Sequence, residues 1–138
     1  MAREFCRGRQ DVVFLDLESP ADAARLAEPL LYLEKQSGLV VLDEVQTMPA
    51  VLNVLRVLAD RDPLPARFLL LGSASPELMN KASESLAGRV EFLEMGGFYV
   101  HEIEDDQDRL WWRGGFPRSY LAPLDDDARI WQQDFTLT

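Results

Sequence analysis

Residues 38–46, Gly-Leu-Val-Val-Leu-Asp-Glu-Val-Gln, constrain the fold of this chain more than any other stretch. Four consecutive apolar residues, Leu39 to Leu42, lack the alternation of a half-exposed strand and indicate a strand buried on both faces. Such strands are typical of the centre of a parallel sheet that helices cover. Asp43 and Glu44 cannot keep their charges in that core, so both are expected at the carboxyl end of the strand, where open α/β sheets bind ligands.

Composition narrows the class of protein. The 138 residues are 47% hydrophobic, enough for one domain with its own core. Cys6 is the single cysteine and His101 the single histidine, so neither an internal disulfide nor a zinc-type cluster is available, and a cytoplasmic location is expected. No apolar run suits a signal peptide or a membrane span. The formal charge of −10 makes nucleic acid an unlikely partner.

Strand-like and helix-like segments alternate along the chain. Strands are expected at residues 11–17, from Gly38, at 67–71 and at 89–95, where charged and apolar residues alternate. Helices are expected from Ser19 with a break near Pro29, after Pro49, and at 76–86. This order predicts an α/β fold, a three-layer sandwich with a mostly parallel sheet. Gly96-Gly97 predicts a boundary, with a small helical segment at 98–138.

Two adjacent carboxylates at the tip of a buried strand suit Mg²⁺-dependent nucleotide hydrolysis. Asp43 would hold the ion, usually through water because Mg²⁺ dehydrates reluctantly, and Glu44 would orient or deprotonate an attacking water. The alternative is a buried strand that ends in a solvated acidic turn. The acidic pair by itself leaves both interpretations open.

Five ordered motifs are similar to those of a bacterial and archaeal group of AAA-type P-loop ATPases that carry a C-terminal domain of unknown function. The matching segments are Val40–Gln46 as Walker B, Leu55–Asp60, Phe68–Ser75, Glu84–Val90 and Trp111–Pro117. The resemblance as a whole extends over roughly residues 11–135. The resemblance implies a partial ATPase core at 1–97, and at 98–138 a lid-like segment with the start of a further domain.

The resemblance also implies ATP and Mg²⁺ as ligands and assigns roles by position. Asp43 would be the Mg²⁺-side carboxylate, Glu44 the water-activating residue, and Ser73 a sensor of the γ-phosphate. Arg89 would stabilise transition-state charge. Two alternatives stay open: Ser73 or Ser75 caps the following helix, and Arg89 is a solvated residue or the partner of a carboxylate.

The family's Walker A loop is not found in these residues. Gly-x-x-x-x-Gly-Lys-Ser/Thr needs a lysine after glycine, and the only lysines, Lys35 and Lys81, follow Glu34 and Asn80. Without that loop, no backbone cradle or lysine binds the β-phosphate, and nucleotide affinity should collapse. In the family the Walker A strand lies between those corresponding to 67–71 and 90–95, so its absence should leave unpaired strand edges. The sequence therefore predicts a fragment of a longer ATPase, hydrolytically inactive or nearly so.

Two other functions compete with this interpretation. A non-enzymatic module could dock on a full-length homologue, or form a homo-oligomer, through the open sheet edge and the apolar segment 109–121. Nucleic-acid binding through Arg109, Arg113 and Arg118 is the weaker alternative because the surroundings are acidic. Trp111 and Trp112 are expected to pack between core and lid rather than to stack on bases.

Overall fold

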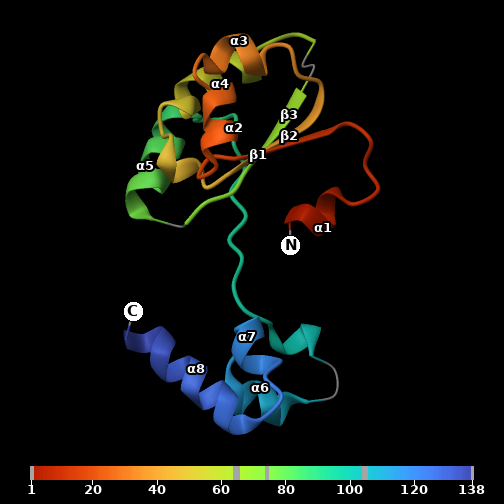
Figure 1. The fold of residues 1–138 in the computed structure, drawn as a ribbon, viewed down its shortest axis with the longest axis vertical. Helices are drawn as coiled ribbons and strands as arrows, with labels where there is room; N and C mark the ends of the chain where they lie inside the picture. The colour runs from red at the N-terminus through yellow and green to blue at the C-terminus, as the bar shows by residue number, and fades with distance from the viewer. Residues whose placement is uncertain (1, 64–65, 74, 104–105, 138) are drawn as a thin grey trace. The chain divides into compact units, whose positions relative to one another are not determined.

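The computed structural model of the protein describes residues 2–63, 66–73, 75–103 and 106–137 (Figure 1). The chain forms two compact units, Met1–Phe92 (unit 1) and Leu93–Thr138 (unit 2), and each is described by itself. The elements of unit 1 are α1 (Ala2–Cys6), β1 (Val12–Asp16), α2 (Pro20–Arg25), α3 (Pro29–Leu33), β2 (Gly38–Asp43), the 3-10 helix η1 (Val45–Thr47), α4 (Val51–Ala59), β3 (Ala66–Leu70) and α5 (Pro76–Ser85). Those of unit 2 are η2 (Val100–Glu102), α6 (Gln107–Arg113), α7 (Pro117–Tyr120) and α8 (Asp125–Leu137).

Unit 1 is built on a parallel three-stranded sheet in the order β1-β2-β3. Leu42 of β2 lies opposite Leu15 of β1 on one side and opposite Leu70 of β3 on the other. The strand that begins at Gly38 is therefore central, and Val40, Val41 and Leu42 are fully buried, as the unbroken apolar run predicts. The α/β class and the parallel sheet are confirmed.

One face of the sheet carries the core. Figure 1 shows α2, α3, α4 and α5 on the same side of the strands. Apolar residues at every second position of the strands pack against these helices and the turns that follow them. Fully buried residues of this core include Leu15, Val40 and Leu42 from the strands, and Leu26, Leu33, Val51 and Leu52 from the helices and turns. The 3.6-residue period of α4 directs its buried residues, among them Leu55 and Leu58, towards this face.

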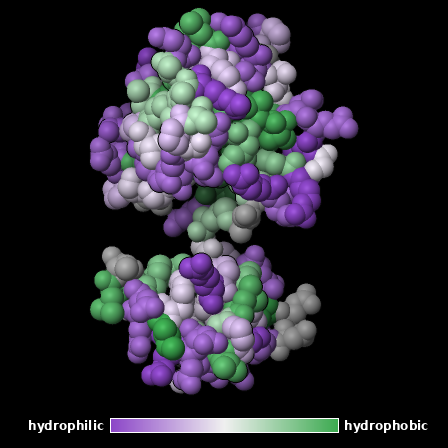
Figure 2. All heavy atoms as spheres, viewed as in Figure 1, coloured by the Kyte–Doolittle hydropathy of each residue, from purple (hydrophilic) through white to green (hydrophobic). Residues whose placement is uncertain are grey.

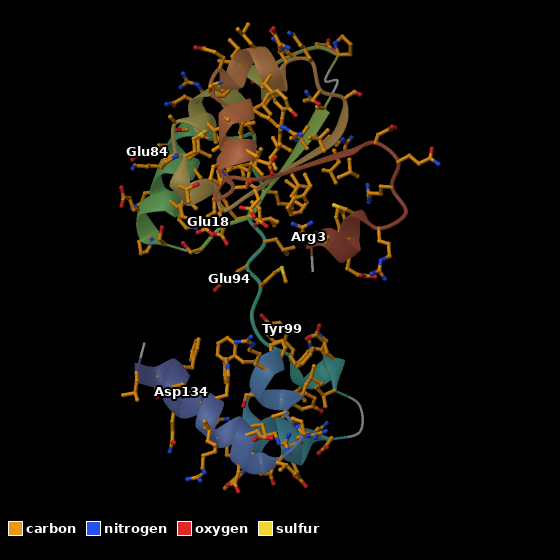
Figure 3. The ribbon with its side chains drawn as sticks, viewed as in Figure 1. Arg3, Glu18, Glu84, Glu94, Tyr99 and Asp134 are labelled. Carbon is orange, nitrogen blue, oxygen red and sulfur yellow. The ribbon has the colours of Figure 1, made fainter. Side chains whose placement is uncertain are left out.

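The opposite face has a thinner cover. By strand alternation it carries Phe14, Val41 and Leu69. The guanidinium carbon of Arg3, a residue of α1 that Figure 3 labels, makes a cation–π contact with Phe14. It lies 4.5 Å from the centroid of the Phe14 ring. Among the described residues this face has one five-residue helix, α1, against the four helices of the other side, so a fully developed three-layer sandwich is not confirmed.

The expected strand at residues 89–95 was wrong, because residues 90–95 form neither strand nor helix. Phe92, Leu93 and Met95 are exposed. An alternating pattern produces a strand only where a neighbour accepts and donates its backbone hydrogen bonds. The outer edge of β3 likewise has no neighbouring strand within the described residues. That this edge is the place of a missing Walker A strand stays a prediction.

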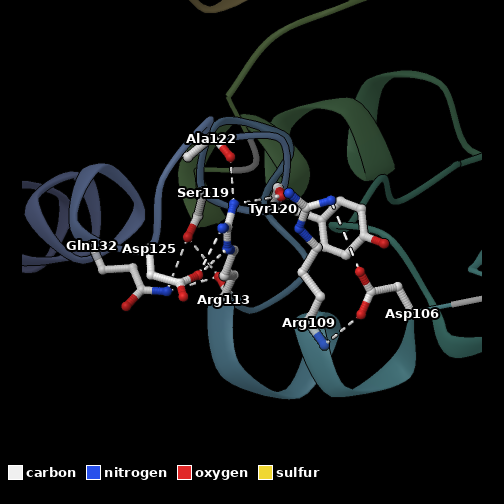
Figure 4. A network of polar contacts seen from close by, with 8 residues as sticks. All are labelled: Asp106, Arg109, Arg113, Ser119, Tyr120, Ala122, Asp125 and Gln132. Atoms are coloured by element: carbon white, nitrogen blue, oxygen red, sulfur yellow. Dashed lines mark hydrogen bonds and ion pairs between the residues drawn. The ribbon is translucent and has the colours of Figure 1, made fainter.

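Unit 2 is helical and has a polar centre at Arg113, whose side chain is buried (6% exposed) at the end of α6. Its guanidinium donates to the carbonyl oxygens of Tyr120 and Ala122 and pairs with Asp125 at 2.6 Å (Figure 4). These contacts join the end of α6 to the end of α7 and the start of α8.

The backbone of Arg113 is held from the other side. Its carbonyl oxygen accepts hydrogen bonds from Ser119 Oγ at 2.6 Å and from Gln132 Nε2 at 2.7 Å (Figure 4). Nearby, Phe98 N–H donates to the Gly115 carbonyl at 2.7 Å, and a Cβ on Gly115 would lie 2.6 Å from the Phe98 oxygen. Only glycine fits at position 115 in this approach of two backbone segments.

Hydrophobic side chains are exposed on unit 2, and some appear in green on the face that Figure 2 shows. Trp111 is 90% exposed and Trp112 is 69% exposed, and the packing of this pair between core and lid stays a prediction. Phe116, Trp131 and Phe135 contact one another with ring centroids 4.9–5.7 Å apart. Across the described ranges of the chain, no helix has the length and apolarity that a membrane crossing requires.

Candidate functional site at the carboxyl edge of the sheet

Asp43 is the last residue of β2 and is partly buried at the carboxyl edge of the sheet. Its backbone oxygen accepts a hydrogen bond from Leu17 N–H at 3.0 Å, and Leu71 N–H donates to the Leu42 oxygen at 2.9 Å. The ends of all three strands are therefore tied together at this edge. These backbone hydrogen bonds fix the position from which the Asp43 side chain leaves the strand.

Glu44 has a left-handed backbone conformation, with φ 58° and ψ 44°. This backbone conformation is unfavourable for glutamate, because left-handed geometry costs a residue with a Cβ about 1–2 kcal/mol. Hydrogen bonds on either side hold the conformation: Val45 N–H donates to the Leu71 oxygen at 3.0 Å, and Thr47 Oγ1 donates to the Glu44 oxygen at 2.8 Å. Such strain is concentrated at functional sites, and it singles out Glu44.

This strain yields a stability prediction. Glu44→Gly and Glu44→Ala both remove the carboxylate, but only alanine keeps the Cβ that opposes a positive φ. We expect the glycine variant to be more stable than the alanine variant by about 1 kcal/mol. Urea unfolding of the two variants measures the difference. Equal stabilities would show that Glu44 is not held in the left-handed region.

Asp16 joins this edge and was missed by sequence reasoning. It is the last residue of β1 and lies in register with Asp43, so the two side chains leave the same face of the sheet. Its Oδ1 accepts Glu18 N–H at 3.0 Å, and Figure 3 labels Glu18, which follows the strand. The sequence pattern that would have identified Asp16 is the same as for Asp43, because Val12–Asp16 is also a run of apolar residues that ends in a carboxylate.

Ser73 and Ser75 follow β3, and the structure separates their roles. Ser75 is the N-cap of α5, where its Oγ accepts Leu78 N–H at 3.3 Å. Ser73 is exposed beyond the end of β3, at the same edge of the sheet as Asp43 and Glu44. The capping role therefore belongs to Ser75, and a sensor role for Ser73 stays a prediction.

Arg89 forms a bidentate ion pair with Asp60. Its Nε and Nη2 lie 2.6 Å and 2.8 Å from the two carboxylate oxygens, and its Nη1 donates to the Ala87 oxygen at 2.9 Å. The carboxylate partner weighed as the alternative for Arg89 is present, at the end of α4. The structure does not bring Arg89 into contact with Asp43 or Glu44; its role as a transition-state cation stays a prediction.

The Arg89 hydrogen bond lowers the pKa of Asp60 below its ordinary value and raises the pKa of Arg89. Because the folded-state pKa of Asp60 is depressed, its contribution to stability is present above the unfolded value of about 3.9 and is lost as pH falls through the folded value. We expect Arg89→Gln to raise the titration midpoint of Asp60 in an NMR pH series. Glu77, whose pKa Lys81 lowers in the same way, is the internal control and should not move.

Of the three arginines considered for nucleic-acid binding, two are engaged inside unit 2. Arg113 is buried in the network of Figure 4, and the Arg109 guanidinium lies 5.5 Å from the centroid of the Tyr120 ring. Arg118 remains exposed. A basic stripe for phosphates is therefore not formed by these residues.

The carboxylate at the sheet edge fits one way of binding Mg²⁺, in which water and substrate phosphates supply the other ligands. Within residues 2–63, 66–73, 75–103 and 106–137, no group of three or more His, Cys, Asp or Glu side chains is arranged to hold a metal ion. Nucleotide enzymes bind Mg²⁺ through one or two carboxylates together with water and substrate phosphates, and Asp43 supplies one such carboxylate. Lys81 pairs with Glu77 at 2.7 Å on α5 rather than at this edge.

Comparisons with known proteins agree with this architecture. A family model described as an AAA domain matches residues 1–104. An uncharacterized protein of Mycobacterium bovis and an uncharacterized protein of Mycobacterium tuberculosis are each 51% identical to the chain over 124 residues. The alignment covers 89% of this chain, which spans 28% of the length of either curated relative. No solved structure matches the chain.

Proposed function

Because the chain belongs to the AAA domain family, which implies an ATPase-like, nucleotide-binding domain, we propose that it supplies the Walker B half of a Mg²⁺-dependent ATP hydrolysis site. Asp43 holds the ion through water. Glu44 takes the proton of the attacking water as the water oxygen bonds to the γ-phosphorus, while the bond between the γ-phosphorus and the bridging oxygen breaks and its electron pair leaves with ADP. Ser73 contacts the γ-phosphate, and Arg89 stabilises the developing charge.

The left-handed Glu44 is the observation that carries this proposal. A solvated acidic turn has no need of a strained glutamate directly after a buried strand, since glycine or asparagine would occupy that conformation at lower cost. The strain is held by hydrogen bonds that involve Leu71, directly after β3, and Thr47 of η1. Glu44 directly follows β2, at the edge where parallel sheets bind ligands.

We propose further that these 138 residues alone do not hydrolyse ATP at a useful rate. They contain no Gly-x-x-x-x-Gly-Lys-Ser/Thr loop, and the outer edge of β3 has no neighbouring strand among the described residues. A Walker A strand placed on that edge would supply the phosphate cradle and complete the three-layer core. In this proposal residues 1–97 are the partial core, and 98–138 are a lid-like segment and the beginning of a further domain.

Two titrations of the 138-residue chain test these statements. A fluorescent ATP analogue should show no micromolar, Mg²⁺-dependent binding; such binding would overturn the proposed inactivity. Mn²⁺, a paramagnetic substitute for Mg²⁺, should broaden the backbone NMR signals of Asp43 and Glu44. Asp43→Asn should remove the broadening, whereas Glu84→Gln on the exposed side of α5 should not. Equal broadening in all three proteins would overturn the metal role of Asp43.

A second function, docking on a homologue, is favoured by the outer edge of β3, which has no neighbouring strand in the part of the chain that the structure describes, and by the exposed Trp111 and Trp112. Backbone pairing at the edge and apolar contact at unit 2 suit a protein partner. Analytical ultracentrifugation tests its self-association form. A single monomeric species over a hundredfold range of concentration would count against a homo-oligomer.

A further inference from the structure

Gln46 contacts the proposed water-activating residue directly. It lies in η1, two residues after Glu44, and its amide Nε2 donates a hydrogen bond to Oε2 of the Glu44 carboxylate. A hydrogen bond to a charged acceptor is stronger than one between neutral groups. Of the two Glu44 carboxylate oxygens, Oε2 is therefore engaged, and Oε1 has no recorded hydrogen bond within the described part of the chain.

The other end of the Gln46 amide lies against Gly72, two residues after the end of β3. Its Oε1 is buried and lacks a hydrogen-bond partner within the described residues. It lies close to Gly72, where a Cβ added to the glycine would come within 2.5 Å of this oxygen. The absence of a side chain at position 72 is what admits the amide. Gln46 thus spans from Glu44 to the residue that precedes Ser73.

The orientation of this amide has an electrostatic cause. If it were flipped, the amide oxygen would face the Glu44 carboxylate, and two acceptors would repel each other. In the observed orientation no donor among the described residues reaches the buried oxygen, which is unfavourable. The observed orientation therefore gives Glu44 a hydrogen-bond donor and leaves Gln46 Oε1 without a partner among the described residues.

We propose that Gln46 is a positioning residue for Glu44, and this rests on the function proposed above. The amide fixes one carboxylate oxygen and leaves the other for the attacking water, and the backbone strain at Glu44 is maintained partly by this contact. Gly72 is the second member of the device because it makes room for the amide. Neither residue touches the reacting atoms in this role.

A charge-swap series in the 138-residue chain tests the proposal. Gln46→Glu places two carboxylates together and should lower the urea midpoint of unit 1. Adding Glu44→Gln restores an amide–carboxylate pair and should recover at least half of that loss. Gln46→Leu should shift the backbone NMR signals of Glu44 away from left-handed values. If the swap only adds a second loss, or if the Glu44 signals stay unchanged in Gln46→Leu, the proposal is overturned.

Gly72→Ala gives an independent check, because it should displace the amide and move the Glu44 signals in the same direction as Gln46→Leu. Ser73→Ala, one residue further, is the control and should leave them in place. The Mn²⁺ titration separates this proposal from the proposed function. A failed swap with Mn²⁺ binding intact overturns the role of Gln46 alone. A successful swap without Mn²⁺ binding at Asp43 overturns the proposed function and leaves the contact between Gln46 and Glu44 standing.

Discussion

Replacing Arg113 with methionine is expected to destabilise unit 2 by about 3 kcal/mol, at the lower end of the cost of breaking a buried ion pair because Asp125 is largely exposed. Methionine fills much of the arginine volume but cannot donate. The carbonyl oxygens of Tyr120 and Ala122 would lose their donor, and the ends of α6 and α7 would lose their link to α8.

Tryptophan fluorescence during urea unfolding measures this effect on unit 2 alone, because all three tryptophans, Trp111, Trp112 and Trp131, lie in it. Arg113→Lys should recover only part of the loss, since an ammonium cannot reproduce the planar fork of the guanidinium. Arg118→Met, at an exposed arginine, is the matched control and should change the unfolding free energy by less than about 0.5 kcal/mol. An Arg113→Met variant as stable as that control would contradict the network of Figure 4.

Leu42→Ala is expected to destabilise unit 1 by about 3–4 kcal/mol. Leu42 is fully buried in the central strand, between Leu15 and Leu70, and a rigid sheet cannot collapse to fill the cavity. Hydrogen exchange followed by mass spectrometry should show faster exchange in β1, β2 and β3, with unit 2 unchanged. Leu31→Ala removes the same atoms from an exposed position in α3 and should cost less than about 1 kcal/mol. Similar losses in the two variants would show that β2 is not the centre of the core.

The sequence predicted the three strands and the helices α4 and α5 because local pattern suffices for them. Val12–Asp16, Gly38–Asp43 and Ala66–Leu70 each contain at least three consecutive apolar residues, and prolines mark where α2 and α5 begin. Residues 89–95 failed because strand formation depends on a neighbour that their own pattern cannot supply.

At the candidate site, residue identity was more predictable than geometry. Asp43 and Glu44 are found where a buried strand must release its charges. The left-handed backbone of Glu44 and its contact with Gln46 depend on Leu71 and Gly72, which are distant in sequence. Arg113 was grouped with surface arginines for a similar reason. Its burial follows from carbonyl groups released where α7 ends, and no local pattern reveals them.

The position of β3 at the edge of the sheet has a consequence for the salt concentration at which the protein should be kept. An apolar strand whose outer edge has no neighbouring strand within the described residues invites association between copies, while a formal charge of −10 keeps the copies apart. The screening length falls from about 10 Å at 0.1 M salt to about 3 Å at 1 M. High salt therefore removes the charge repulsion that opposes association at the edge of β3, and a buffer of low ionic strength preserves it.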